Sequence, residues 1–318
     1  MAMDNLICFS QHMARAGWRV RVAVRRPNEA NFVRPYGVVG QVEPIQANVR
    51  DEASTRAAIA GAAAVVNCVG IMAETKRQTF EAVVEGGAAR IARIAAEEGV
   101  SRLVHVSAIG ADQGSDSFYA AAKGRGEEAV RRAFPGAVIL RPSVVFGVDD
   151  SFFNRLAGMA RLMPVLPLVA PDTRFQPVYV KDVAAAAATA VTTAAAPGVY
   201  ELGGPEVMSL RELTERMLGI IQRRRLILPL PFWLARLQAW FLDLGPRLTR
   251  GLIGNGILTR DQVRLLAHDN VVAPHARGLR DLGIEPTAMD AILETYLYAY
   301  RPHGQFDAIT DSAKNLRT

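Results

Sequence analysis

The chain has 318 residues, of which 50% are hydrophobic and 21% charged, a composition typical of a globular protein and not of a disordered one. Its two cysteines, Cys8 and Cys68, lie far apart without a CxxC pair, which argues against a disulfide framework or a thiolate zinc site and favours a reducing compartment. No uncharged apolar run reaches the roughly 18 residues that a membrane-spanning helix needs, and the first residues do not resemble a secretory leader.

The charge balance favours an anionic partner. Lysine and arginine exceed aspartate and glutamate by 37 to 31, which gives a net charge of +6 and a pI near 9.6. Such a surface suits a nucleotide phosphate, an acidic subunit or a lipid surface. We do not expect nucleic acid as a partner, because the arginines are spread along the chain and no nucleic-acid-binding module is recognisable.

The first half of the chain has the pattern of an α/β protein. Short runs rich in Val and Ile alternate with amphipathic stretches, as in parallel strands buried between helices. We therefore predict a Rossmann-like, doubly wound parallel sheet over residues 1–147, with its ligands at the carboxyl ends of the strands. Strands are expected at residues 18–24, 63–69, 103–107 and 137–145, and helices at residues 51–61, 78–98 and 119–133.

After residue 147 the pattern changes to that of a smaller C-terminal α/β lobe, which we place at residues 148–302. Short strands are expected at residues 175–180 and 198–202. A helix over residues 209–222 opens with a capping box, because Glu212 follows Ser209 by three positions. Residues 303–318 form a polar tail without periodicity, which is expected to be loosely ordered.

The strongest chemical signal is the combination of Ser107, Tyr119 and Lys123. Ser107 ends a predicted strand, and Tyr119 and Lys123 stand four positions apart on the next helix, where they share one face. In such an arrangement the lysine can lower the pKa of the phenol and hold a ribose hydroxyl, while the serine orients a carbonyl. A YxxxK spacing alone also occurs by chance on helix surfaces, so the signal depends on the strand that ends at Ser107.

Residues that follow other predicted strands are candidates for cofactor binding. Arg25 and Arg26 follow the first strand, where a guanidinium would meet a 2′-phosphate and favour NADPH over NADH; the alternative is a pair of solvated arginines. Asn48 and Val49 follow the next apolar stretch and could contact adenine, although a helix N-cap near Asp51 explains the same residues.

Two further strands contribute candidates. Asn67 and Gly70 end the 63–69 strand, where a glycine lets the backbone approach a cofactor, and a simple turn is the alternative. Arg141 lies in the 137–145 strand and completes the set. The five histidines show no metal-ligand spacing with one another or with the cysteines, so we predict no metal site.

Together these residues resemble the short-chain dehydrogenase/reductase superfamily, in its extended or atypical branch. More specifically, the chain is similar to the NADPH-binding accessory subunits of respiratory complex I over roughly residues 17–306. The similarity is carried by the runs RVRVAVRRPNEA, QANVRDEAS, HVSAIGAD, ILRPSVVFG, TRFQPVYVKDVA, YELGGPEV, LTRDQVRLL and DLGIEPT.

The resemblance implies a noncatalytic accessory subunit of NADH:ubiquinone oxidoreductase that holds NADPH as a structural cofactor. It further implies contact with other complex I subunits and a peripheral position on the cytoplasmic face of a bacterial inner membrane, or on the matrix face of a mitochondrial one. Two alternatives remain. One is an active NADP-dependent reductase or epimerase, in which Ser107, Tyr119 and Lys123 are catalytic; the other is a cofactor-free scaffold.

The chain departs from the family at its start. The family begins with a strand and a GxxGxxG loop that holds the pyrophosphate at a helix N-terminus. Here residues 1–16 contain no glycine and leave no room for that strand. Either the true start lies upstream or the phosphate cradle has been lost, and in the given sequence we expect a central strand to be missing.

One segment of the second lobe is unusually aromatic. Residues 231–244 are predicted to form a helix that places Phe232, Trp233 and Trp240 on one broad face. Such a helix can lie in a membrane interface or pack on a partner subunit, and an ordinary buried helix is the alternative.

Overall fold

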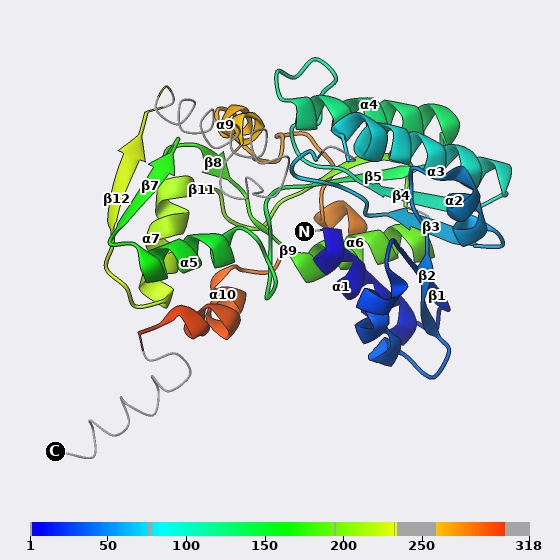
Figure 1. Cartoon of the computed structure of the whole chain (residues 1–318), viewed down its shortest axis with the longest axis horizontal. Coiled ribbons are helices and arrows are strands. Elements are labelled where there is room, and N and C mark those ends of the chain that lie inside the picture. Colours follow the sequence, from blue (N-terminus) through cyan, green and yellow to red (C-terminus); the bar gives the residue numbers. More distant parts are fainter. Residues whose placement is uncertain (1, 76–77, 194, 232, 234–258, 303–318) are drawn as a thin grey trace.

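The computed structural model describes residues 2–75, 78–193, 195–231, 233 and 259–302. Its larger lobe is built on a four-stranded sheet with the order β10-β5-β4-β3, in which all neighbours are parallel. The bounds of these strands are β3 (Ala64–Asn67), β4 (Arg102–Val106), β5 (Val138–Pro142) and β10 (Gly198–Leu202). The predicted Rossmann-like α/β fold is confirmed, and Figure 1 shows the sheet between two layers of helices.

Both faces of this sheet are covered. On one face lie α2 (Glu52–Ile59), α3 (Gly86–Glu97) and α4 (Phe118–Ala133), which bury Leu103 of β4. On the other face lie α1 (Ala2–Arg15) and α6 (Val180–Thr192), which bury Val104 of the same strand. The alternation of Leu103 and Val104 between two apolar layers explains why β4 reads as a continuous apolar run.

The sheet is interrupted where we expected a missing strand. The strands β1 (Val20–Val24) and β2 (Val42–Gln46) pair in parallel with each other, but among the described residues neither pairs with the four-stranded sheet. The outer edges of β1 and β3 therefore have no strand partner in the described chain. Helix α1 contacts both β1 and α6, and its Phe9 and Met13 join the main core. The doubly wound sheet thus consists of two separate parts.

Between β1 and β2 the chain forms a 3₁₀ segment, η1 (Pro27–Tyr36), which buries Val33 against Val22 and Val42. A π-helical turn, η2 (Glu81–Glu85), precedes α3, so the helix expected over residues 78–98 begins with a wider turn. This turn approaches α4 closely, since a Cβ on Gly126 would lie 3.2 Å from the Val84 carbonyl oxygen.

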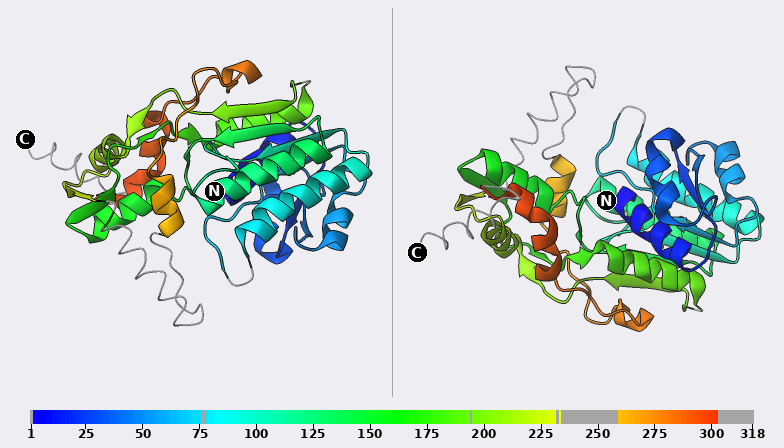
Figure 2. Two further views of the ribbon diagram at one scale, coloured as in Figure 1. Left: turned by 90° about the horizontal axis from the view of Figure 1, so that it is seen from above. Right: turned by 90° about the horizontal axis from the view of Figure 1, so that it is seen from below.

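The smaller lobe has its own core around Phe146, Phe153, Leu213 and Leu293. Figures 1 and 2 show its elements on the side of the molecule opposite α2 and α3. Its strands pair as β7 with β12, β8 with β11 and β6 with β9. The strands are β6 (Val145–Phe146), β7 (Val165–Val169), β8 (Arg174–Phe175), β9 (Val178–Tyr179), β11 (Met208–Ser209) and β12 (Leu226–Leu230).

The helices of this lobe are α5 (Phe153–Leu162), α7 (Leu210–Ile220), α9 (Arg260–Leu265) and α10 (Asp290–Leu297), with a short 3₁₀ turn, η4 (Tyr298–Tyr300). A second 3₁₀ turn, η3 (Arg280–Leu282), packs on α6 in the larger lobe. Helix α7 has the predicted capping box, in which Ser209 and Glu212 each bond to the other's backbone. None of the helices in the described part of the chain is both long and apolar enough to cross a bilayer.

The structure corrects the predicted division at residue 147. Strand β10 and helix α6 follow that position in sequence, but β10 pairs with β5 and α6 covers the larger sheet. The chain therefore returns to the first lobe before it completes the second. The predicted strand at residues 137–145 is also divided, because β5 ends at Pro142 and β6 pairs separately with β9. The expected aromatic helix at 231–244 and the tail at 303–318 lie outside the described residues, except for positions 231 and 233.

Candidate active and cofactor site

A cavity of about 1000 Å³ lies between the two lobes, at the carboxyl ends of β4 and β5. Ser107, Tyr119 and Lys123 all line it, so the structure brings the predicted combination together. Ser107 follows the last residue of β4, and its backbone N–H donates to Leu140 across the sheet at 2.7 Å. Its side chain is only 4% exposed, and its hydroxyl has no hydrogen-bond partner among the described residues.

Helix α4 positions the other two side chains. Its start is set by Ser117, whose hydroxyl accepts a hydrogen bond from the Ala120 N–H, and its last turn carries Arg131 and Arg132, which suit the negative end of the helix dipole. The spacing of four residues places Tyr119 and Lys123 on one face. The helix runs against the preceding loop so closely that a Cβ on Gly124 would lie 2.5 Å from the Gln113 nitrogen.

The electrostatics of this pair differ from our expectation. Burial raises the pKa of Tyr119 to about 12, and the ring packs edge-to-face on Phe80 at 5.8 Å. Lys123 is 3% exposed, and burial lowers its pKa to about 8, which Glu127 partly opposes. The Lys123 ammonium donates to the Val106 carbonyl oxygen at 3.0 Å. We expected the lysine to lower the phenol pKa; instead desolvation dominates at both groups.

The side chain of Asn67 makes hydrogen bonds within the protein. Its amide oxygen accepts a hydrogen bond from the Val69 N–H at 3.0 Å, so its amide nitrogen is directed to Nδ1 of His105, also at 3.0 Å. Burial lowers the pKa of His105 to about 3, which favours the neutral form of the ring. Gly70 lines the cavity, and a Cβ there would meet only the Lys123 ammonium at 3.7 Å. Gly70 therefore leaves open space toward the cavity.

Arg141 also lines the cavity, but its guanidinium is engaged. It donates twice to the buried Glu127 carboxylate, at 2.9 and 2.7 Å, and it lies 3.4 Å from Glu201. A further bond joins it to the Ala111 carbonyl oxygen at 3.2 Å. These partners raise the pKa of Arg141 and hold its guanidinium in place at the wall of the cavity.

The remaining predicted residues lie away from the cavity. Arg25, Arg26, Asn48 and Val49 are not among its lining residues, and neither is Asn67. Arg26 pairs with Glu29 at 2.8 Å on the surface, whereas exposed Arg25 has no ion pair within the described residues. The arginines follow β1, which belongs to the separate two-stranded part of the sheet.

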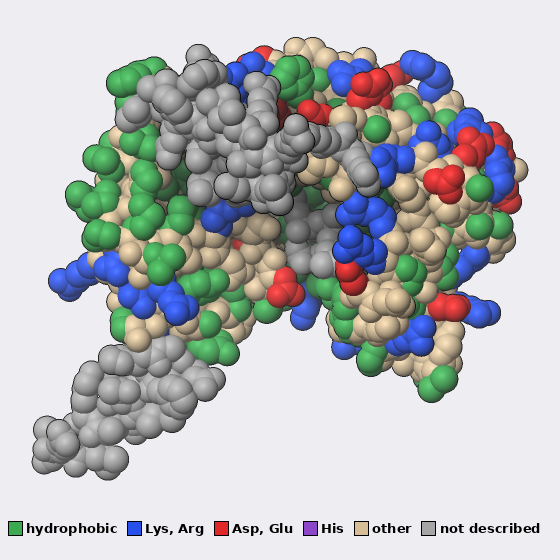
Figure 3. Space-filling view, in the orientation of Figure 1, with side chains coloured by type: hydrophobic (Ala, Val, Ile, Leu, Met, Phe, Trp, Pro, Cys, Tyr) green, Lys and Arg blue, Asp and Glu red, His purple; other side chains and the backbone are tan. Residues whose placement is uncertain are grey.

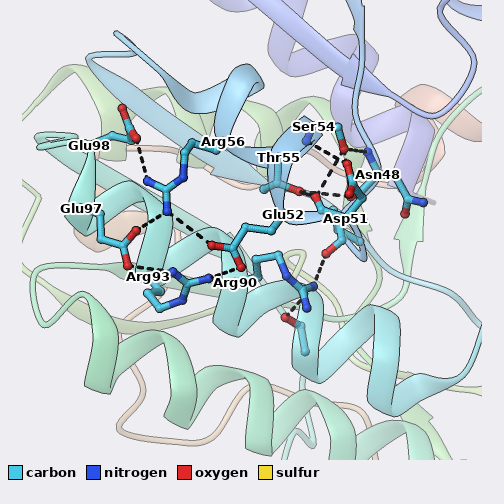
Figure 4. A network of polar contacts seen from close by, with 12 residues as sticks. Asn48, Asp51, Glu52, Ser54, Thr55, Arg56, Arg90, Arg93, Glu97 and Glu98 are labelled. Atoms are coloured by element: carbon cyan, nitrogen blue, oxygen red, sulfur yellow. Dashed lines mark hydrogen bonds and ion pairs between the residues drawn. The ribbon is translucent and has the colours of Figure 1, made fainter.

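The helix-capping alternative for Asn48 is confirmed. The Asp51 side chain accepts from the Ser54 N–H at 2.9 Å, and the Asn48 amide oxygen accepts from the Arg50 N–H at 3.2 Å. Figure 4 shows that this turn joins a network in which Arg56 and Arg93 bridge the acidic ends of α2 and α3. The hydrogen bonds of Asn48 and Asp51 stabilise the turn that follows β2.

Two residues that sequence reasoning missed hold the site. Glu127 continues the i, i+4 series of Tyr119 and Lys123 along α4, and this spacing was a signal for it. Asp261 of α9 accepts hydrogen bonds from the Phe118 N–H at 2.7 Å, the Tyr119 N–H at 3.0 Å and the Ser117 hydroxyl at 3.0 Å. Asp261 thus joins the smaller lobe to the first turn of the helix that carries Tyr119.

The chemistry of a metal centre has no support here. Within the part of the chain that the structure describes, no group of three or more His, Cys, Asp or Glu residues could hold a metal ion. Cys68 lines the cavity, but burial raises its pKa to about 12, so it is a thiol and not a nucleophilic thiolate.

Comparison with known proteins places the chain in a family. Residues 8–153 match the model of an NAD(P)H-binding family. The chain is 34% identical to the NADH dehydrogenase [ubiquinone] 1 alpha subcomplex subunit 9 of Arabidopsis thaliana, over 96% of this chain and 77% of that protein. It is 29% identical to the 40 kDa subunit of the NADH-ubiquinone oxidoreductase of Neurospora crassa, over 96% and 79%.

Its fold is also that of solved nicotinamide-dependent enzymes. The NADPH-dependent quinone oxidoreductase QOR2 of Escherichia coli, solved with NADPH, superposes with a TM-score of 0.68 at 17% identity over 92% of this chain and 94% of that one. At that identity the likeness supports the fold alone. The curated relatives go further, because their similarity spans nearly the whole chain. This protein belongs to the family of the alpha subcomplex subunit 9 of NADH dehydrogenase (ubiquinone), the accessory subunits of respiratory complex I.

Proposed function

We propose that this protein is a noncatalytic accessory subunit of NADH:ubiquinone oxidoreductase that binds NADPH as a structural cofactor. The family supports the assembly, and the match to an NAD(P)H-binding family supports a nicotinamide cofactor. The observation that carries the cofactor assignment is the Ser107 hydroxyl, which is buried, lacks a partner in the described chain and faces the cavity beside Tyr119 and Lys123.

The residues present fit one end of the cofactor. A buried polar group without a partner costs about 1–3 kcal/mol, and a ligand carbonyl or amide at Ser107 would recover this cost. Gly70 leaves room for the ring, and Lys123 is within the same cavity for a ribose hydroxyl. A bound dihydronicotinamide would supply a hydride donor at this place.

The choice of NADPH over NADH rests on Arg25. Arg26 is paired with Glu29, but Arg25 is exposed after the end of β1 and has no ion pair among the described residues. An unpaired guanidinium can bind a 2′-phosphate with two parallel hydrogen bonds. Arg25 is therefore the residue that we assign to the 2′-phosphate.

The protonation states favour a structural role. A proton-transferring tyrosine needs a pKa near the working pH, but burial raises that of Tyr119 to about 12. The Lys123 ammonium donates to the Val106 carbonyl oxygen, and the pKa of the Tyr119 phenol is raised by burial alone. Ser107, Tyr119 and Lys123 then orient and enclose the nicotinamide end without exchanging protons.

Docking in the complex is expected at the edge of the smaller lobe. Figure 3 shows hydrophobic side chains gathered there. Leu226 and Leu228 of β12 are 65% and 47% exposed, and Trp233 just beyond the strand is 68% exposed. Phe232 and Trp240 lie outside the described residues, so the assignment of the aromatic segment to lipid or to a subunit stays a prediction. We place the protein peripherally, on the cytoplasmic face of a bacterial inner membrane or the matrix face of a mitochondrial one.

Purification from native membranes tests the assembly. The proposal expects the protein to comigrate with NADH:quinone oxidoreductase activity and expects no NADPH consumption by the isolated chain. A free pool that oxidises NADPH with a carbonyl substrate would contradict it.

That second result would support the alternative, an active NADP-dependent reductase or epimerase. One observation favours it: Ser107, Tyr119 and Lys123 do share one cavity. Tyr119→Phe separates the two functions, because an enzyme would lose its turnover while a structural cofactor would stay bound.

A further inference from the structure

The cavity extends well beyond the residues assigned to the nicotinamide. Its volume of about 1000 Å³ stands at the upper end of the roughly 300–1,000 Å³ typical of ligand pockets. From Ser107 it continues into the smaller lobe, where its walls come from α5, β7, β12 and α9. The lining residues of this distal chamber include Leu156, Met159, Leu168, Val169, Leu230 and Leu265.

The distal chamber is apolar, and part of its apolar surface is not covered by the described chain. Leu156 and Leu168 are buried behind it, whereas Met159, Leu230 and Leu265 are only half-buried. Covering such surface with a ligand chain contributes about 0.8 kcal/mol per methylene. Arg155 and Gln262 line the cavity from the same helices, but most of the chamber's lining is apolar and suited to an aliphatic chain.

The cavity as a whole carries charged side chains of both signs. Four acidic side chains line the cavity, together with Lys123 and two arginines. Of the arginines, Arg141 is already paired with Glu127 and Glu201. Two buried polar atoms lack a partner in the described structure, Nε2 of His105 and the hydroxyl of Ser107, and of these residues Ser107 lines the cavity. A hydroxyl or carbonyl head would satisfy it, while a free carboxylate would also meet the acidic side chains.

From this change between a polar lining near Ser107 and an apolar lining in the distal chamber, we propose that the cavity is a binding site for a neutral single-chain amphiphile. Its hydroxyl or carbonyl head lies at Ser107, and its aliphatic tail lies in the distal chamber between α5, β7 and α9. The tail site is separate from the nucleotide residues, but the head takes the place of the nicotinamide at Ser107, so the amphiphile binds the nucleotide-free protein. Asp261 holds the α9 wall in place by its bonds to the start of α4.

A chain-length series on the full-length, nucleotide-free protein tests this site. The neutral fluorophore N-phenyl-1-naphthylamine is bound first, and straight-chain 1-alkanols of increasing length then displace it. Affinity should rise about fourfold per methylene and reach a plateau when the chamber is full. Decanol should displace the probe better than decanoate or decyltrimethylammonium. Affinity that keeps rising without a plateau, or that does not depend on length, would overturn the proposal.

Substitutions in the distal chamber test where the aliphatic tail of the ligand binds. Met159→Trp fills the chamber and should move the plateau to shorter alkanols, and Leu265→Trp should do the same from α9. Leu162→Trp is the matched control on α5, because Leu162 is 83% exposed and does not line the cavity. Ser107→Ala should weaken alkanol binding about 2- to 12-fold without moving the plateau, as expected for one hydrogen bond. An unchanged plateau in both cavity variants, each checked by thermal melting, would contradict the tail site.

Discussion

Replacing Lys123 by methionine should remove a specific pH dependence of stability. Lys123 is 3% exposed, and burial lowers its pKa to about 8 from its usual value near 10.5. Between these two values the unfolded chain binds more protons at this residue than the folded chain does. Stability therefore rises with pH in this window, because the cost of burying the charged form disappears as the folded lysine deprotonates.

The size of the effect follows from the two pKa values. From pH 7 to pH 9.5 the contribution of Lys123 should become more favourable by about 2 kcal/mol. Urea unfolding measured at both pH values gives the change for the natural chain and for Lys123→Met. Other groups titrate in both proteins and largely cancel in the difference between them. The variant should lack the gain of about 2 kcal/mol.

Lys181→Met is the matched control, because Lys181 is an exposed lysine on α6. That variant should keep the full pH dependence of the natural chain. If Lys123→Met and the natural chain show the same change between pH 7 and pH 9.5, then Lys123 keeps an ordinary pKa and our description of the site's electrostatics is wrong.

Three further substitutions test individual contacts. Gly124→Ala should lower the free energy of unfolding by about 1–3 kcal/mol, because the new Cβ would lie 2.5 Å from the backbone of the preceding loop. Gly219→Ala, on the open surface of α7, should raise it by up to about 1 kcal/mol, and thermal melting compares the two variants. Asp261→Ala should cost about 1–2 kcal/mol, because two backbone N–H groups of α4 lose their acceptor; a melting curve like that of the natural chain would show that the contact does not stabilise the protein. Arg25→Ala should weaken NADPH binding about 10- to 100-fold with little effect on NADH binding, while Arg26→Ala should weaken NADPH binding less. Calorimetric titration measures the affinity of each variant for both nucleotides. Equal losses of NADPH affinity in the two variants would refute the assignment of Arg25.

Much of the larger lobe could be predicted because its residues follow local rules. The strand that ends before Ser107 and the helix that carries Tyr119 and Lys123 were both expected, and both form with bounds close to the prediction. Their convergence on one cavity followed from the parallel topology, in which the carboxyl ends of the strands meet at one edge. The capping box at Ser209 was likewise a local signal that the structure confirms.

The features that the sequence could not show depended on contacts between residues that are far apart in the sequence. Arg141 was expected to contact a cofactor, and its bonds to Glu127, which lies on a different element, could not be read from the sequence. The phenol of Tyr119 was expected to have a lowered pKa, and the packing of Phe80 around it could not be read from spacing. The return of β10 to the first sheet was missed for the same reason, since pairing with β5 leaves no local mark.

The most direct test of the account is to identify the nucleotide carried by the protein purified from its native membranes. The protein is denatured, the supernatant is separated by liquid chromatography, and the nucleotide is identified and counted by mass spectrometry. The account predicts close to one NADPH per chain. Recovery of NADH in its place, or of no dinucleotide at all, would contradict the claim that this cavity holds a phosphorylated nicotinamide cofactor.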